Sequence, residues 1–358
     1  MLKNHLAFAP YNSRRDSDVR QLFHDYTHKD HQLRVMGVPK ERMVQYLEKS
    51  LSKSHMQTIC LREKSRLLGL ITLQSLPWMS DHFGLQMFAV SHLLTNSASP
   101  LIHARLLRYV IEELKKVDFL DCRVAVDDIF AAHALEICDF RYVGTEIYMG
   151  LALNSATPPS PHPVYEIRPC APKERNQVLQ IAGETHVYNR FVYDPFIDEN
   201  VAKSLYRRVV AKCFEEDHFN VLIAQSQGEV QGFIISKMNP AFAQEVGQFY
   251  GSLDFIGVRP ERRNRGLGIA LCQWALHHLA KQNAVFAAVR TLANNYAALA
   301  TCLHTGFRIT STSLHFHKWI GRPAVYHRTP MSSTRHRRNS AIRMGIPEFG
   351  TNYQIGIE

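Results

Sequence analysis

The stretch that decides the fold runs from Val258 to Gly268 and reads V-R-P-E-R-R-N-R-G-L-G. The apolar run 249–258 before it predicts a strand. After it, apolar residues recur at helical spacing: Leu267, Leu271, Trp274, Ala275 and Leu279. Two glycines at such a turn let a ligand approach the backbone closely, and the first N–H groups of the helix are free. With Arg263 and Arg265 beside them, these groups predict an anion site suited to a pyrophosphate.

A second segment, Asn295-Tyr296-Ala297-Ala298-Leu299, opens a predicted helix that ends in Gly306-Phe307. Together with the turn, it makes residues 165–320 resemble the GCN5-related N-acetyltransferases (GNATs). The resemblance implies an α/β (α+β) fold, with a mixed, mainly antiparallel sheet flanked by helices, as a complete GNAT domain. It also implies acetyl-CoA as co-substrate, a small-molecule amine as acceptor and no metal.

The resemblance assigns the donor side of the site. It implies that Val258, at the end of a splayed strand, bonds through its backbone to the pantetheine arm and the thioester carbonyl. It implies that Asn295 contacts the cofactor near its pantetheine. The pyrophosphate would be held by the backbone amides of Arg263, Asn264, Arg265, Gly266, Leu267 and Gly268.

The catalytic side departs from the family. The tyrosine usually proposed as the acid lies seven residues after the asparagine, where this chain has Cys302. A thiol with a pKa of about 8.5 could protonate the CoA thiolate, or Cys302 is a small buried residue. Asp254 lies four residues before Val258 and is therefore expected on the same side of the strand. It is the candidate base, acting directly or through water, or else the partner of a nearby arginine.

Two shorter segments narrow the resemblance. Residues 189–196 read N-R-F-V-Y-D-P-F and resemble the R-F-x-x-D segment of dTDP-fucosamine acetyltransferases and related enzymes. Residues 76–84 read L-P-W-M-S-D-H-F-G and resemble the L-x-W-D-S-x-F-F-G segment of that group, with Met79 where aspartate is usual. These matches imply a nucleotide-linked (dTDP-type) amino sugar as the acceptor.

Arg190 is the candidate for binding a phosphate of that acceptor, or it forms a surface ion pair with Asp194 or Glu184. Two other functions stay open. One is acetylation of another small amine, an antibiotic or a protein terminus. The other is a non-catalytic module that senses acyl-CoA, suggested by the missing tyrosine.

The chain divides at residues 154–163, where four prolines in ten residues predict a linker. Residues 1–153 repeat the order of elements of 164–320, and Asp128…Cys138-Asp139-Phe140 corresponds to Asn295…Thr305-Gly306-Phe307. We therefore expect tandem GNAT-like modules. The first is degenerate, because residues 91–100 contain neither glycine nor arginine, and would complete the substrate cleft or a dimer interface rather than bind acetyl-CoA.

Charge and composition limit the partners, the cellular location and the cysteine chemistry that we expect for this chain. The formal net charge is +10, and the tail 321–358 holds six arginines against two glutamates. We expect this basic tail to be disordered and solvated, although a cluster at residues 335–338 could contact nucleic acid or an anionic membrane. No apolar run reaches the roughly 18 residues of a membrane span, and no signal peptide is evident. We expect a cytoplasmic protein, a possible homodimer, without disulfides or zinc, since seven scattered cysteines include no CxxC.

Overall fold

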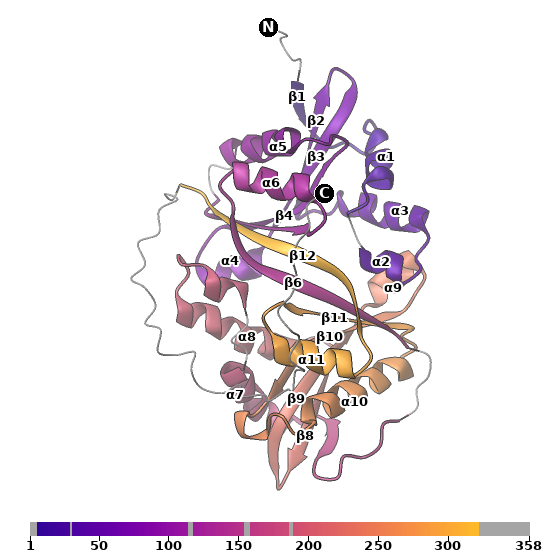
Figure 1. The fold of residues 1–358 in the computed structure, drawn as a ribbon, viewed down its shortest axis with the longest axis vertical. Coiled ribbons are helices and arrows are strands. Elements are labelled where there is room, and N and C mark those ends of the chain that lie inside the picture. The colour runs from indigo at the N-terminus through magenta and orange to yellow at the C-terminus, as the bar shows by residue number, and fades with distance from the viewer. Residues whose placement is uncertain (1–5, 29–30, 114–116, 154–157, 186–188, 322–358) are drawn as a thin grey trace, which may run out of the picture. The chain divides into compact units, whose positions relative to one another are not determined.

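The computed structural model describes residues 6–28, 31–113, 117–153, 158–185 and 189–321 (Figure 1). The predicted tail beyond residue 321 and residues 154–157 of the predicted linker lie outside this described part. Within it, no helix has the length and apolar character needed to cross a membrane.

The first half of the chain forms six strands and six helices among its described residues. The strands are β1 (Leu6–Pro10), β2 (Met56–Glu63), β3 (Arg66–Ser75), β4 (Met87–Thr95), β5 (Phe119–Ala125) and β6 (Arg141–Ala152). The helices are α1 (Asp18–Asp25), α2 (His31–Val35), α3 (Lys40–Ser50), α4 (Pro77–Phe83), α5 (Pro100–Glu113) and α6 (Ile129–Ile137).

The second half repeats this order. Its strands are β7 (Glu166–Pro169), β8 (Phe219–Ser226), β9 (Glu229–Met238), β10 (Tyr250–Val258), β11 (Phe286–Leu292) and β12 (Arg308–Trp319). Its α-helices are α7 (Arg175–Thr185), α8 (Glu199–Cys213), α9 (Pro240–Val246), α10 (Leu267–Lys281) and α11 (Tyr296–His304). Three short 3-10 turns complete it: η1 (Pro172–Glu174), η2 (Arg190–Tyr193) and η3 (Pro260–Arg262).

The duplication inferred from the sequence extends to single residues. β5, α6 and β6 recur 167 residues later, at equal lengths, as β11, α11 and β12. The preceding connection differs between the halves. The turn from β10 to α10 is four residues longer than its counterpart from β4 to α5. The extra length falls in the glycine-containing stretch singled out from the sequence.

All twelve strands form one sheet, in the order β1-β2-β3-β4-β5-β12-β6-β11-β10-β9-β8-β7. The two halves exchange their last strands: β12 pairs with β5 of the first half, and β6 pairs with β11 of the second. The exchanged strands also pair with each other, antiparallel, at the centre of the sheet (Figure 1). This mixed, mainly antiparallel sheet flanked by helices confirms the predicted fold class, and it continues without a break across the predicted boundary.

Helices cover both faces of the sheet. α5 and α6 pack on one face of the first half, through a core that includes Leu107, Leu120 and Leu135. α10 and α11 pack on the same face of the second half, around Met149, Leu271 and Phe307. The opposite face carries α1 and α3 over the first half and α7 and α8 over the second, and η2 and α4 pack there beside the central strands.

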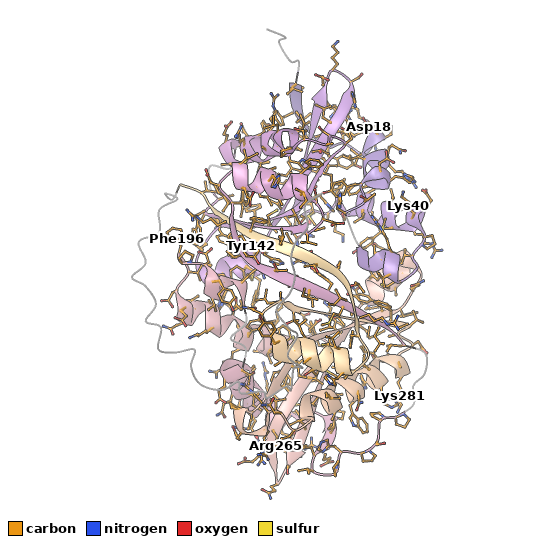
Figure 2. All side chains as sticks on the ribbon, in the orientation of Figure 1. Asp18, Lys40, Tyr142, Phe196, Arg265 and Lys281 are labelled. Atoms are coloured by element: carbon orange, nitrogen blue, oxygen red, sulfur yellow. The ribbon has the colours of Figure 1, made fainter. Side chains whose placement is uncertain are left out.

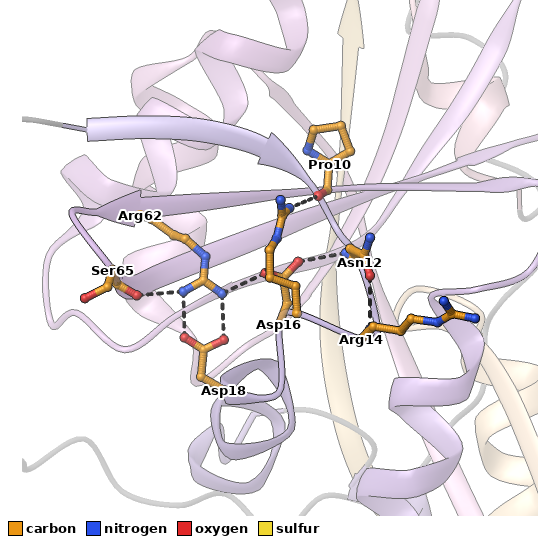
Figure 3. A network of polar contacts seen from close by, with 8 residues as sticks. Pro10, Asn12, Arg14, Asp16, Asp18, Arg62 and Ser65 are labelled. Carbon is orange, nitrogen blue, oxygen red and sulfur yellow. Dashed lines mark hydrogen bonds and ion pairs between the residues drawn. The ribbon is translucent and has the colours of Figure 1, made fainter.

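An ion-pair network anchors the turn from β1 into α1 (Figure 3). The Arg62 guanidinium donates to both carboxylate oxygens of Asp18, at 2.6 and 2.7 Å, to Asp16 at 3.1 Å, and to the Ser65 carbonyl at 2.8 Å. The backbone N–H of Asn12 donates to the other oxygen of Asp16 at 2.7 Å. Arg15 also pairs with Asp16, at 3.5 Å, so the charge of this carboxylate, which is only 2% exposed, is compensated by its neighbours.

Candidate active site

The two central parallel strands of the second half part from each other. β10 and β11 pair from Tyr250–Phe286 to Leu253–Val289 and no further. Beyond that point β10 continues to Val258 beside β9, whereas β11 continues beside β6. The backbone of residues 254–258 is therefore without a strand neighbour on its β11 side, which is the splayed strand that the resemblance implies.

A β-bulge at the point of parting changes the direction of Asp254. The register between β10 and β9 shifts between Leu253 and Phe255, which leaves Asp254 as the extra residue. Leu253, Ile256 and Val258 all pack toward α10, whereas Phe255 packs toward α7. Asp254 therefore lies on the face opposite to the Val258 side chain. The expectation that both share one side is wrong, because regular alternation does not hold across the bulge.

Asp254 is exposed on the face that carries α7 and α8, and it accepts a hydrogen bond of 2.6 Å from the Ser252 hydroxyl. Its charge acts on Tyr250 and Arg290, side chains of the same face. The carboxylate thus stands at the mouth of the gap between the two strands, in contact with solvent.

Side-chain hydrogen bonds of three arginines fix the turn after β10. Arg259 and Arg262 bind Val230 and Gln231 at 2.8 and 3.1 Å, and Arg263 donates to the Val258 carbonyl at 3.2 Å. Asn264 and Gly266 have φ of 59° and 77°, so the chain turns through two left-handed residues. The N–H of Arg263 donates to the Pro260 carbonyl at 3.3 Å, so the expectation that this amide holds the pyrophosphate is wrong. The N–H groups that follow it are not used by these contacts.

The start of α10 has free donors. Gly266 is the N-cap and supplies no side chain, and within the described residues no acceptor is present for the N–H groups of Arg265, Gly266 and Gly268. Arg265 is exposed at this turn (Figure 2). Free amides, a helix N-terminus and an exposed guanidinium together can hold an anion such as a pyrophosphate.

Asn295 is the N-cap of α11. Its side-chain oxygen accepts from the N–H of Ala298 at 3.4 Å, which caps α11, and its amide donates to the Thr291 hydroxyl at 3.0 Å. The equivalent residue of the first half, Asp128, caps α6 by accepting from Ala131 at 3.1 Å. Since that half lacks the glycine turn, the cap is explained without a cofactor, and the predicted contact with the pantetheine stays a prediction.

Cys302 faces the interior. It is 5% exposed and packs among residues of α10 such as Leu267 and Cys272. Burial raises the pKa of the Cys302 thiol to about 12. The near match between thiol and CoA thiolate that favoured an acid role is therefore absent, and the packing alternative fits the geometry.

The segment that contains Arg190 joins the two halves. Arg190 does not pair with Asp194 or Glu184, as the sequence suggested; its guanidinium binds Asp121 of β5 and stacks over Phe191, 4.3 Å from the ring centroid. Burial alone would raise the pKa of Asp121, but the charges of Arg190 and His317 outweigh it and hold that pKa below its usual range. Arg190 is thus already paired with a carboxylate.

Asp194 is likewise an internal anchor. It is 2% exposed and accepts from His317 at 2.7 Å and from the indole of Trp319 at 3.1 Å, both on β12. Burial opposes its ionised form, yet the hydrogen bond and charge of His317 hold the pKa of Asp194 below its usual value. The R-F-x-x-D resemblance therefore falls on residues that bind the exchanged strand to the second half.

A group of charged residues that the sequence did not suggest lies across the central strands, on the face of the sheet that carries α7 and α8. Arg123 of β5, Arg290 of β11 and His315 of β12 converge on one atom, Oε2 of Glu146, at 3.5, 4.0 and 3.3 Å. The side chain of Tyr148 joins them through its hydroxyl, which accepts from Arg123. We call these five residues the central charged group. Arg123 and Arg290 are separated by the repeat distance of 167, which is the signal that could have indicated them.

Among the described residues, no set of three or more histidine, cysteine, aspartate or glutamate side chains is placed to hold a metal ion.

Comparison with known proteins places this geometry in context. Residues 182–307 match the acetyltransferase (GNAT) family. The chain is 22% identical over 297 residues to the spore coat polysaccharide biosynthesis protein SpsD of Bacillus subtilis, covering 80% of this chain and 98% of that one. It is also similar in fold to a GCN5-related N-acetyltransferase from Sphaerobacter thermophilus (TM-score 0.60, 12% identity, 91% and 98% covered). A tandem GNAT protein of clavulanic acid biosynthesis is similar as well (TM-score 0.51, 15% identity, 89% and 99% covered).

Proposed function

We propose that this chain, whose residues 182–307 match the acetyltransferase (GNAT) family, transfers an acetyl group from acetyl-CoA to the amine of a small acceptor. The favoured acceptor is a nucleotide-linked, dTDP-type amino sugar. The observation that carries the proposal is the open turn from Arg263 to Gly268, with free N–H groups on Arg265, Gly266 and Gly268, next to the splayed end of β10. A pyrophosphate at the turn and a thioester along residues 254–258 would lie on one continuous stretch of backbone.

The positions of donor and acceptor in the proposed reaction follow from the two sides of β10. The thioester carbonyl would accept a hydrogen bond from the unpaired strand backbone, which stabilises the oxyanion of the tetrahedral intermediate. The acceptor would enter on the face that exposes Asp254, which takes a proton from the ammonium directly or through water. The amine then attacks the carbonyl carbon and a C–N bond forms. The nitrogen gives up its second proton to water, the C–S bond breaks, and the departing CoA thiolate takes a proton from water. No step requires Cys302.

The preference for an amino sugar has separate support. The relative from Bacillus subtilis is named for polysaccharide biosynthesis, and the alignment extends over nearly its whole length. Transfer to another amine, an antibiotic or a protein terminus, and a module that senses acyl-CoA without turnover, are the alternatives that the experiment must separate. Cytoplasmic localisation, the domain limits 1–153 and 164–320, and a homodimer stay predictions from the sequence.

The experiment is calorimetric titration of the whole protein with acetyl-CoA. A methyl group at Gly268 would meet Thr301 at 3.5 Å, an ordinary contact, so Gly268→Ala should fold normally while crowding the ligand. We expect its affinity for acetyl-CoA to fall about tenfold, or ~1.4 kcal/mol. Gly183→Ala, in α7, is the matched control, since its methyl group would meet only Arg207 at 3.8 Å. No binding by the wild type would overturn the proposal.

The acceptor is then identified by CoA release. dTDP-amino sugars, polyamines and peptides are tested in parallel at the same concentration of acetyl-CoA. Turnover with the amino sugars alone supports the favoured acceptor, and turnover with another class replaces it. Binding of acetyl-CoA without turnover of any of them favours the sensing module.

A further inference from the structure

The central charged group has more positive than negative charge. Burial alone would raise the pKa of Glu146, but the hydrogen bond from His315 and the charges of Arg290 and Arg123 outweigh it and keep the carboxyl ionised. Burial lowers the pKa of His315, whose side chain is fully buried, so the ring is neutral near pH 7. Two guanidinium groups are therefore balanced by one carboxylate.

The excess charge is open to solvent. The side chain of Arg290 is 58% exposed and that of Arg123 is 37% exposed, whereas the Glu146 side chain between them is 12% exposed. The carboxylate thus lies beneath and the two guanidinium groups lie at the surface. Since both approach the same oxygen, at 3.5 and 4.0 Å, they are close enough for one phosphate to contact both.

The group lies beside the place where the amine must react. Arg290 follows Val289, which forms the last pair between β11 and β10, and Asp254 follows Leu253 of the same pair. The two side chains interact electrostatically on one face of the sheet. Tyr206 of α8 bounds this region from the helix side, because it packs on Phe255 and the charges of Arg190 and Arg290 act on its hydroxyl.

We infer that Arg123 and Arg290 bind a phosphate group of the acceptor and so orient its amine toward Asp254. One guanidinium comes from each half of the duplicated chain, so the second half alone would hold only half of this anion site. Guanidinium groups suit phosphate because they donate in a planar, forked geometry. The inference rests on the proposed function for the role of Asp254, and it names the acceptor class as a phosphate-bearing amine.

The test measures binding, not turnover. With CoA at saturating concentration to occupy the turn from Arg263 to Gly268, dTDP and inorganic pyrophosphate are titrated calorimetrically into wild type, Arg123→Gln and Arg290→Gln, with thymidine as the neutral probe. We expect dTDP and pyrophosphate to bind each variant at least about tenfold more weakly than wild type, and the salt dependence of binding to decrease. Arg105→Gln, an exposed arginine on α5 at the opposite face, is the matched control and should bind as wild type does.

Two further measurements exclude a folding defect or a change in the donor site as the cause of weaker phosphate binding. Acetyl-CoA affinity of both variants should equal that of wild type, and Arg290→Lys, which keeps the charge beside Glu146 but not the forked donors, should recover only part of the lost phosphate affinity. Unchanged affinity for dTDP and pyrophosphate in both glutamine variants would overturn the inference, as would an equal loss of acetyl-CoA affinity. If wild type binds dTDP but not acetyl-CoA, the proposed function fails while this site stands.

A carboxylate ligand is the remaining alternative for these arginines. Glutamate is titrated under the same conditions as the probe. Binding of glutamate that depends on Arg123 and Arg290, without binding of dTDP or pyrophosphate, would overturn the assignment to phosphate.

Discussion

Asp128 and Asn295 hold the same position in the two halves of the chain, 167 residues apart, and each caps the helix that follows it. The oxygen of each accepts from the backbone N–H three residues on, at 3.1 Å in the first half and 3.4 Å in the second. One is a carboxylate and the other an amide. The pair therefore allows the cap to be separated experimentally from any contact with a cofactor.

Replacement of Asn295 separates these roles. Asn295→Ala removes the cap and should lower the free energy of unfolding by about 1 kcal/mol. Asn295→Asp keeps a capping oxygen and should be nearly as stable as wild type, but it loses the amide hydrogens. Urea unfolding measures the first effect, and calorimetry with acetyl-CoA the second. If Asn295→Asp binds acetyl-CoA like wild type, the residue is a cap only.

The pH dependence of stability should reveal Asp128. Burial raises the pKa of its carboxyl from 3.8 to about 6. The folded protein then keeps a proton between about pH 4 and 6 that the unfolded chain has lost, so this group makes stability fall as pH rises through that window. The cost is complete above pH 6. Asp128→Asn removes it, and its stability relative to wild type should rise by about 2–3 kcal/mol from pH 4 to pH 7.

Unfolding curves at several pH values check this prediction. The control is Asp217→Asn, an exposed aspartate, whose stability relative to wild type should stay constant across the window. If the stability of Asp128→Asn relative to wild type does not change with pH, the raised pKa of Asp128 is contradicted.

Cys302 provides a test of the acid. Because the pKa of its thiol is raised to about 12, it stays protonated throughout the range in which the enzyme would be measured. Cys302→Ala should leave the shape of the pH–rate profile between pH 6 and 9 unchanged, with a loss of stability of roughly 1 kcal/mol from the small cavity. Loss of a basic limb of the profile in the variant would restore the acid role.

The geometry of the turn before α10 was predictable because it depends on residues that are adjacent in the chain. A left-handed residue at Gly266 and an uncapped helix start at Leu267 follow from residues adjacent in the chain. The helix indicated by the apolar spacing from Leu267 to Leu279 is observed as Leu267–Lys281. Such features need no knowledge of distant partners.

The rest depends on pairing that no single segment reveals. Asp254 could be placed only after the bulge was seen against β9, since a strand pattern does not show an extra residue. For Arg190 the sequence suggested a phosphate of the acceptor or an ion pair with Asp194 or Glu184, whereas its observed partner, Asp121, lies on β5 of the other half. The exchange of β6 and β12 has the same cause, because neither strand's own sequence indicates which half it pairs with.

The exchange predicts that the second half is unstable by itself. A chain of residues 158–321 would lack β6, which covers the edge of β11 and supplies Ile147, Met149 and Leu151 to the core beneath α10. Each such side chain contributes about 1.5–3 kcal/mol when buried. We expect residues 158–321 to aggregate or unfold at room temperature. Residues 141–321, which retain β6, are the matched comparison and should give the more stable protein, measured by size-exclusion chromatography and urea unfolding. Equal stability of the two fragments would mean that β11 does not need the exchanged strand, and the halves could then be treated as separate modules.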